Sequence, residues 1–486
     1  MQMKYITAAV ASALAVMSAG QSYAAQGVSS SQDAYLQAVA PGVEFTSVLT
    51  TGDTVGNYRM VGLPDGLGAY DNGNGTFTVL MNHEFGAGSG AAAHGVLGAG
   101  SFISEWVINK STLQVVSGGD LIKNVYGWDA STQQSSTVAS LGVSFNRFCS
   151  ADLAQSTAFY NAATGVGTTA RIFLNGEEGG ANGRALATVA TGADKGSTFV
   201  LGKMNQSTNG SGTSATGGWE NLLANPFAQN KTVVIGNNDG GTGMMNNALA
   251  VYVGTKQATG TDVDKAGLTN GTTKFVNVVG ITSEISNATS RTTSIADGAR
   301  FTLDATKSTT FSRPEDGAWS ADGKTYYFVT TDQLDKTELT GQTQKGGTRL
   351  WAMNFDDISN PDAGGSIKKL IDTSTNLGGV GETKPNMFDN IAVNKDGTLT
   401  ILEDVGNAEH NGKVWNFDPI TGKMTMMGKF DPALFGDVTN GSFVAGTHTK
   451  DEETSGVIDI TNILGRNDGK QYSLLVAQDH ASAASL

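Results

Sequence analysis

Acidic residues follow or flank the ends of β-prone runs along this chain, and carboxylates gathered in this way could hold metal ions. The positions are Asn82-His83-Glu84, Glu177-Glu178, Asp239, Arg313-Pro314-Glu315-Asp316, Asp332 and Glu403-Asp404. Several carboxylates share a small space only when cations neutralise them, because like charges repel at close range. Calcium is the expected ion, since it prefers carboxylate and carbonyl oxygens. We therefore predict metal ligation by Glu84, Glu177, Glu178, Asp239, Glu315, Glu403 and Asp404.

Arg313 and His83 are the catalytic candidates among these positions. A guanidinium among carboxylates either pairs with them structurally or binds an anionic group of a substrate, and the residue types leave both interpretations open. If the ligand is a phosphate, Arg313 and the cations would together stabilise a phosphoryl transition state. His83 could act as a metal ligand or a base, or it could be a hydrogen-bonded structural residue.

The acids must be positioned by β-hairpins, because the chain repeats one hairpin pattern. Residues 69–84, 319–332 and 393–404 each place an Asp-Gly or Asn-Gly turn between two short β-prone runs, and the second run ends on an acid. Such turns are the strongest short-range signal for a hairpin. The runs 171–178 and 231–239 also end on acids, without that turn. Any single acid could be a solvated turn residue, but recurrence at one place in a repeat favours a shared site.

A second hairpin, which carries a tryptophan, recurs at residues 104–116, 349–356 and 413–425. Paired hairpins along a chain are typical of a β-propeller, in which each blade has four strands. A β-sandwich would use the same hairpins. We favour the propeller because radial symmetry would bring the acidic strand ends together, whereas a sandwich would scatter them. The fold class predicted is all-β, a propeller of roughly five or six blades with loop insertions at 206–218 and 255–273.

The amino terminus has the features of a secretory signal peptide. Lys4 precedes an apolar stretch from Ile6 to Met17, and Ser22-Tyr23-Ala24 provides a small-x-small cleavage pattern. The apolar stretch is shorter than the ~20 residues that span a bilayer. We expect a signal peptide at 1–25, a lead-in segment at 26–45, a single propeller domain at 46–486, and a secreted, periplasmic or extracellular location.

Composition restricts the partners. The net charge of −14 argues against nucleic acid and anionic membrane surfaces, and it suits calcium. The single cysteine, Cys149, excludes an intramolecular disulfide, and its surroundings in the sequence indicate a small buried residue rather than a nucleophile. We expect a monomer that is not inserted in a membrane and, if the anion bound by Arg313 is a phosphate, a small phosphorylated substrate as its partner.

Four short motifs resemble, in order, those of the PhoX-type alkaline phosphatases and of related phytase-like and esterase-like propellers. They are Leu80-Met-Asn-His-Glu84, Glu177-Glu178, Arg313-Pro-Glu315 and Leu402-Glu-Asp404. The resemblance implies a propeller whose central calcium and iron cluster hydrolyses phosphate monoesters. It implies that Arg313 contacts the substrate phosphate and that Glu315 binds metal. It also implies cluster carboxylates at Glu84, Glu178 and Glu403.

The chain departs from this family at one ligand. The family carries an iron-binding cysteine just before the paired glutamates, where this chain has Asn175-Gly176, and Cys149 lies upstream in another motif. The departure leaves three hypotheses. The first is a phosphoesterase that uses calcium, with or without iron. The second is a non-catalytic, calcium-stabilised propeller that binds a surface or matrix. The third is a lactonase or other esterase with His83 as its base.

Overall fold

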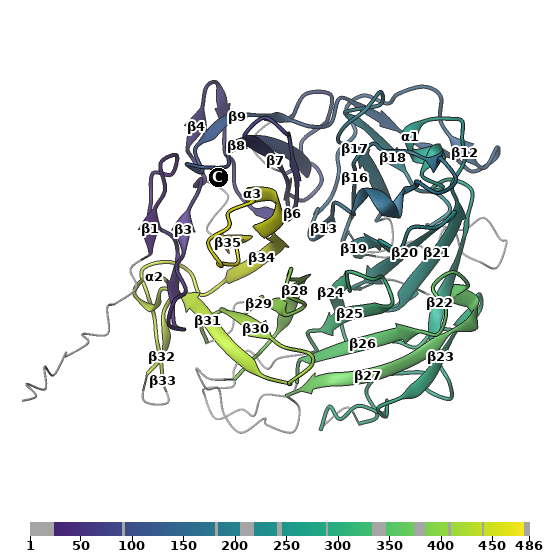
Figure 1. The fold of residues 1–486 in the computed structure, drawn as a ribbon. Coiled ribbons are helices and arrows are strands. Elements are labelled where there is room, and N and C mark those ends of the chain that lie inside the picture. The colour runs from purple at the N-terminus through teal and green to yellow at the C-terminus, as the bar shows by residue number, and fades with distance from the viewer. Residues whose placement is uncertain are drawn as a thin grey trace, which may run out of the picture.

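The computed structural model is a β-propeller, as the hairpin repeats predict (Figure 1). It describes residues 24–89, 93–179, 183–204, 218–240, 245–287, 290–332, 347–373, 384–406, 410–439 and 442–480. Within these ranges six innermost strands follow one another around a closed ring, in the order β6, β13, β19, β24, β28 and β34. Each begins one blade, so the described residues form six blades.

The first three blades are built from antiparallel strands, with one parallel edge strand in blade 2. Blade 1 contains β6 (Pro64–Asp71), β7 (Thr76–His83), β8 (Phe102–Asn109) and β9 (Val115–Asp120). Blade 2 contains β13 (Ala151–Asp152), β16 (Ile172–Gly176), β17 (Ala185–Val189), β18 (Ser197–Val200) and the edge strand β10 (Asn124–Tyr126). Blade 3 contains β19 (Trp219–Ala224), β20 (Lys231–Asn238), β21 (Leu249–Thr255) and β22 (Thr272–Val278).

The last three blades differ in size. Blade 4 contains β24 (Pro314–Trp319), β25 (Thr325–Thr330), β26 (Arg349–Phe355), β27 (Gly365–Asp372) and β23 (Ala299–Asp304). Blade 5 contains β28 (Phe388–Val393), β29 (Leu399–Glu403), β30 (Lys413–Phe417), β31 (Met424–Phe430) and β2 (Leu36–Ala38). Blade 6 pairs β34 (Glu452–Asp459) with β35 (Ser473–Asp479).

Short elements decorate these blades. The two-stranded pairs are β1 (Ala25–Gln26) with β3 (Thr46–Ser47), β4 (Thr54–Val55) with β5 (Tyr58–Arg59), β11 (Trp128–Asp129) with β12 (Gln134–Ser135), β14 (Tyr160–Asn161) with β15 (Val166–Gly167), and β32 (Asp437–Thr439) with β33 (Ser442–Val444). The α-helices are α1 (Asp262–Lys265), α2 (Pro432–Phe435) and α3 (Thr461–Leu464). Within the described part of the chain, 3₁₀ turns span Ser156–Ala158 and Pro361–Ala363.

Two edge strands tie distant segments to the ring. Strand β2, which lies in the segment expected as a lead-in, pairs antiparallel with β31 and completes the outer edge of blade 5. Strand β23 pairs with both β22 and β27, so blades 3 and 4 share one nine-stranded sheet. These blades therefore depart from the uniform four-stranded units that the sequence predicts.

The hydrophobic core is divided into clusters between neighbouring blades. Trp351 packs with Ile235 of blade 3, and Trp106 packs with Val476 of blade 6. Trp415 packs with Leu350 of blade 4. All three tryptophans lie on the third strand of their blades, and each is at most 4% exposed. The predicted tryptophan hairpins are thus the outer halves of blades 1, 4 and 5, and each indole fills the space beside the adjacent blade.

Two sequence expectations concern other segments. Residues 255–273 were expected as an insertion between blades, but they connect β21 to β22 within blade 3 and include α1. Nearly all of 206–218, and residues 1–23 of the expected signal peptide, lie outside the described residues. Among the helices that the structure describes, none has the length and apolar character needed to cross a membrane.

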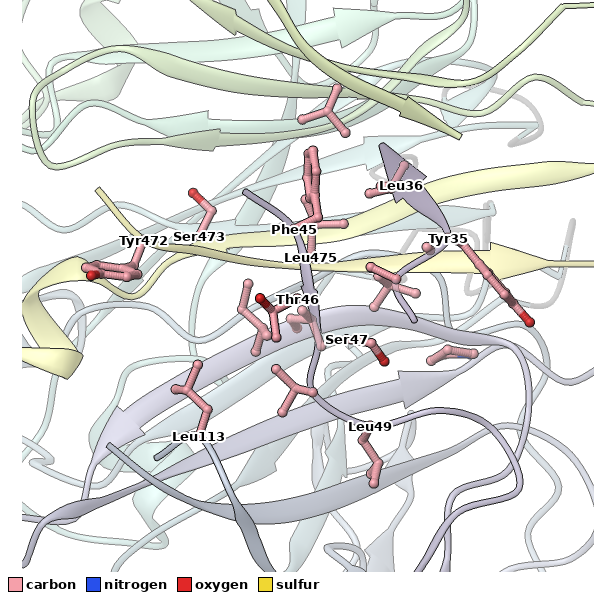
Figure 2. A pocket seen from close by; sticks show the side chains of 18 of the residues that line it. Tyr35, Leu36, Phe45, Thr46, Ser47, Leu49, Leu113, Tyr472, Ser473 and Leu475 are labelled. Atoms are coloured by element: carbon pink, nitrogen blue, oxygen red, sulfur yellow. The ribbon is translucent and has the colours of Figure 1, made fainter. Parts of the chain in front are cut away.

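A cavity of about 1360 Å³ lies between blade 1, blade 6 and the segment that contains β2 and β3. Figure 2 shows Phe45, Thr46 and Ser47 of that segment beside Leu475 of β35. Apolar side chains such as Met60 and Trp106 contribute much of its wall. None of the acids predicted as metal ligands lines this cavity.

Candidate metal centre

Each innermost strand carries an acid as its second residue. In β13 this is Asp152, which is half-buried and accepts a hydrogen bond from the Ala224 amide at 3.0 Å. The other five, here called the inner acids, are Asp65 on β6, Glu220 on β19, Glu315 on β24, Asp389 on β28 and Glu453 on β34. All five are buried. In every one of these strands except β34, the pairing register shifts at the acid. Such bulges re-aim side chains, which explains how buried strands present carboxylates at one edge of the ring.

A second layer of residues follows the second strand of each blade. These rim residues are Glu84 after β7, Glu178 after β16, Asp239 after β20, Asp404 after β29 and His480 after β35. All five are half-buried. Their backbone positions are equivalent from blade to blade: the amides of Glu84 and Asp404 donate to the carbonyls of Leu63 and Met387, at 2.8 and 3.1 Å. The acceptor in each case immediately precedes the innermost strand.

The two layers approach each other closely enough to share cations. Four sets of side chains have ligand atoms within 4.8 Å of one another: Asp65, Glu84 and Cys149; Cys149, Glu178 and Glu220; Glu220, Glu315 and Asp389; and Glu84, Glu453 and His480. Successive sets have Glu84, Cys149 or Glu220 in common, so they form one continuous site that draws on all six blades. The predicted convergence of acidic strand ends therefore occurs for Glu84, Glu178 and Glu315.

Cys149 belongs to this site, which its position in the sequence did not indicate. Its side chain is buried, and its Sγ lies 3.1 Å from Glu178 Oε2. Burial and the carboxylates of Glu178 and Glu84 raise the pKa of the Cys149 thiol well above its ordinary value. Asn175-Gly176, which stands where a family cysteine was expected, lies on β16, and Asn175 faces Ala151 directly across the sheet. Cys149 thus contacts Glu178 from the segment that immediately precedes the neighbouring strand β13.

The carboxyls cannot all ionise without a counterion. Burial, partly opposed by Arg147, raises the pKa of Glu178 to about 8. Burial raises the pKa of Glu220 to about 7, although Ser150 donates to its carboxylate. Burial and neighbouring carboxylates also raise the pKa values of Asp65, Asp389 and Glu453 well above the usual range. A metal ion would remove this repulsion.

The donor set fits hard cations in most places and a softer ion in two. The set formed by Glu220, Glu315 and Asp389 offers only carboxylate oxygens as ligands, which suits calcium. Asp65 Oδ1 is buried and has no hydrogen-bond partner among the described residues, as expected for an oxygen that binds a cation. Cys149 and His480 add one sulfur and one nitrogen, ligands that transition metals prefer.

Two arginines lie on the solvent side of the carboxylates. The Arg313 Nη2 atom is 2.6 Å from Glu315 and 3.1 Å from Asp239. The Arg147 Nη2 atom is 2.8 Å from Glu84 and 2.5 Å from Glu178. Their side chains are 38% and 48% exposed, while those of the four acids are between 3% and 13% exposed. Both guanidiniums could therefore contact a soluble anion above the carboxylates.

Three predicted site residues have other partners. Glu177 is buried in an ion pair with Arg184. Glu403 accepts hydrogen bonds from Trp415 Nε1 at 2.7 Å and from the Asn386 amide at 2.8 Å. The ring nitrogens of His83 contact Gly62 O and Ser104 Oγ, and burial lowers its pKa to about 4. These contacts are those of structural residues, and none of the three belongs to the four sets.

Blade 4 has no acid at its rim position. Thr331 occupies it, because its amide donates to Arg313 O at 3.0 Å as the rim amides do in other blades. The predicted Asp332 is fully buried one residue later, in ion pairs with Arg291 and Arg349. Asp239 and Asp404, by contrast, are at rim positions. Together with Glu315, their negative charges raise the pKa of Arg313.

Sequence reasoning missed Asp65, Glu220, Asp389, Glu453, His480 and Arg147. Four of these are inner acids, and three inner acids share a visible local pattern. Pro64-Asp65-Gly66, Pro314-Glu315-Asp316-Gly317 and Phe388-Asp389-Asn390 each place an acid directly after the strand's first residue and before small or polar residues. That pattern also resembles a surface turn, so by itself it does not indicate a strand that carries a ligand. Glu315 was predicted together with its neighbour Arg313, whereas Asp65 and Asp389 were not predicted.

No protein-family model matches the sequence, and no curated protein matches it. Solved structures do match the fold. The vanadate complex of Pseudomonas fluorescens PhoX is 11% identical, with a TM-score of 0.50, over 82% of this chain and 81% of that one. A 6-phosphogluconolactonase-like protein from Bacteroides uniformis is 12% identical, with a TM-score of 0.32, over 72% and 80% of the two chains. The periplasmic gluconolactonase of Pseudomonas aeruginosa is 12% identical, with a TM-score of 0.31, over 78% and 87%.

At 11% identity, the match to PhoX supports the propeller fold alone. The resemblance to PhoX-type phosphatases seen in the short motifs is therefore accompanied by a similar fold, but not by sequence similarity across the chain.

Proposed function

We propose that this protein is a metal-dependent phosphoesterase that hydrolyses phosphate monoesters at the calcium-containing site formed by the inner acids and rim residues. The observation that carries the proposal is the position of Arg313, half-exposed above a buried set of carboxylates that fits metal ions. Cations and a fixed guanidinium are the groups that phosphoryl transfer requires, because charge on the phosphoryl oxygens must be neutralised.

Buried and exposed residues of the site would have different roles in this reaction. The inner acids and the rim residues hold the metal, which would polarise phosphoryl oxygens and supply an activated oxygen nucleophile. Arg313 binds two phosphoryl oxygens through its planar fork and orients the ester for attack. Arg147, which lies beside Glu84 and Glu178, would bind further oxygens of the same substrate. The substrate is thus a small phosphorylated molecule that fits between two cationic groups.

Metal identity follows from the ligand atoms. We propose calcium at the carboxylate set and iron beside Cys149, because thiolate ligands favour transition metals over calcium. The sequence alone left iron doubtful, since no cysteine precedes Glu177. The contact between Cys149 and Glu178 supports iron again, because it supplies that thiolate from another strand.

The decisive experiment measures hydrolysis of p-nitrophenyl phosphate by the purified protein loaded with calcium, with and without iron. We expect turnover that Arg313→Ala reduces strongly and that chelation abolishes. Elemental analysis of the same protein gives calcium and iron per chain. A protein that binds calcium but shows no turnover under any metal condition would contradict the proposal and favour a non-catalytic binding propeller.

Export completes the proposal. We propose that the segment 1–25 is removed and that the protein acts outside the cytoplasmic membrane, which supports a calcium-based site because free calcium is abundant there. Amino-terminal sequencing of protein recovered from the periplasm or medium tests this, with cleavage near Ala24 or Ala25 as the expected result.

A further inference from the structure

His480 occupies a rim position that carboxylates fill in other blades. Its backbone amide donates to Asp451 O at 3.1 Å, just as the amides of Glu84 and Asp404 donate to the carbonyls that precede their innermost strands. Blade 6 therefore presents an imidazole where blades 1, 2, 3 and 5 present a carboxylate. His480 therefore offers a nitrogen ligand at a rim position where four other blades offer carboxylate oxygens.

The imidazole belongs to one of the four sets of ligand atoms. His480, Glu84 and Glu453 have ligand atoms within 4.8 Å of one another. The Nε2 atom is 3.5 Å from Glu453 Oε2, which is longer than a good hydrogen bond. Two ligands about 2.1 Å from a tetrahedral metal lie about 3.4 Å apart, so the separation suits a shared ion. The side-chain oxygen of Gln478 is in hydrogen-bond contact with Nε2, a contact that metal binding at Nε2 would replace.

The other ring nitrogen also faces a carboxylate. His480 Nδ1 lies 3.5 Å from Asp451 Oδ2, which is likewise longer than a good hydrogen bond. A carboxylate that closes on the far nitrogen of a metal-bound histidine fixes the ring orientation and makes the ligating nitrogen more basic. Gln478 is anchored in turn, because its Nε2 donates to Pro64 O at 3.1 Å. Asp451 and Gln478 therefore restrict the orientation of the imidazole from its two sides.

We propose that His480, Glu84 and Glu453 bind a divalent first-row transition ion such as zinc or iron(II), at a position separate from the calcium ions and from Cys149. Imidazole nitrogen favours such ions, whereas carboxylate oxygens alone favour calcium. Glu84 also belongs to the set with Asp65 and Cys149, so it would bridge this ion to the neighbouring metal. The proposal rests on the metal centre of the proposed function, but not on its phosphatase activity.

Metal content tests the proposal without any substrate. The purified protein, His480→Ala, His480→Asp and a control, His448→Ala, are analysed for metals per chain by mass spectrometry. His448 suits the control because it is exposed and lies beside Phe435, away from the acids. We expect His480→Ala to lose one equivalent of transition metal and to keep its calcium. His480→Asp should replace that equivalent with calcium, and His448→Ala should match the unaltered protein.

X-ray absorption on the unaltered protein and on Cys149→Ser provides a measurement that does not depend on folding of a histidine variant. We expect a nitrogen ligand about 2.0–2.1 Å from the transition metal, with the imidazole's outer-shell signal. Unchanged transition-metal content in folded His480→Ala, or no imidazole signal in either protein, would overturn the proposal. A protein with phosphatase activity and calcium alone would do so as well, while leaving the proposed function intact.

Discussion

Arg147 and Arg313 occupy the same structural position in blades 2 and 4. Both adopt the left-handed conformation, with φ of 47° and 56°, immediately before an innermost segment. The carbonyl of each accepts a backbone amide from the end of the second strand, at 3.0 Å from Glu178 and from Thr331 respectively. The equivalence explains why two guanidiniums that are distant in sequence each face carboxylates of the same continuous site.

We predict that both arginines contribute to substrate binding. Arg313→Ala should lower kcat/KM for p-nitrophenyl phosphate by about 100-fold and Arg147→Ala by about tenfold, because each removes a charge-assisted hydrogen bond of about 1.5–3 kcal/mol. Steady-state kinetics with matched metal content checks this. Arg300→Ala is the control, because Arg300 forms an exposed ion pair with Asp356 on an outer strand. Full activity of Arg147→Ala would restrict phosphate binding to Arg313.

Chelated protein should lose stability as the pH rises. Burial raises the pKa of Glu220 to about 7 and that of Glu178 to about 8 in the metal-free fold, against about 4.3 when unfolded. A raised folded pKa means that the folded state holds more protons, so the favourable contribution is complete below about pH 4 and is lost through pH 8. Thermal unfolding in EDTA from pH 5.5 to 9 should therefore give a falling Tm. Added calcium should flatten the curve, and an equally steep fall with calcium would contradict a shared metal site.

Cys149 is predicted to be a metal ligand rather than a free thiol. Cys149→Ser should lose iron and any thiolate-to-iron absorption in the visible range while retaining calcium, because the carboxylate set does not include sulfur. Visible spectroscopy and elemental analysis measure both effects. In chelated protein the thiol should react slowly with a disulfide reagent at pH 8, since burial raises its pKa. Equal iron content in the two proteins would show that Cys149 is structural.

Asp332 and Asp404 should respond differently to the same substitution. Asp332→Asn should lower the free energy of unfolding by about 1.5–3 kcal/mol, because buried Arg349 would lose one charged partner while keeping Glu284 and Asp372. Its metal content should not change. Asp404→Asn should lower metal content with little effect on the stability of chelated protein, since Asp404 is a half-buried rim residue. Denaturant unfolding and elemental analysis distinguish the two outcomes, and metal loss in Asp332→Asn would place that residue in the site.

The hairpins could be predicted from the sequence because their determinants are local. The Asn72-Gly73-Asn74-Gly75 turn and the acid at its far end, Glu84, lie in one continuous segment. The turn favours the paired strands wherever the segment is placed. The same locality explains why Trp351 and Trp415 identified the outer halves of blades, since each lies in its own alternating strand.

The inner acids could not be predicted in this way. Asp389 and Glu453 are buried carboxylates. Asn390 Nδ2 donates to Asp389 at 3.0 Å, but the acids that could share a cation with either residue are distant in sequence. Their neighbours are supplied by other blades, so only closure of the ring brings Asp389 to Glu220 and Glu315. His83 and Glu403 illustrate the converse case. They stand beside true rim residues in the sequence, but strand alternation turns them toward structural partners.

The sequence by itself determined the blade repeat, the acidic ends of second strands and the place of Arg313, because each follows from a short run of residues. Tertiary structure alone decided which acids share space, because that depends on pairing between blades. It also brought Cys149 to Glu178 and His480 to Glu84, contacts across long sequence separations that no local pattern encodes. The chemistry of the site, with one sulfur and one nitrogen among carboxylates, is therefore a property of the closed ring.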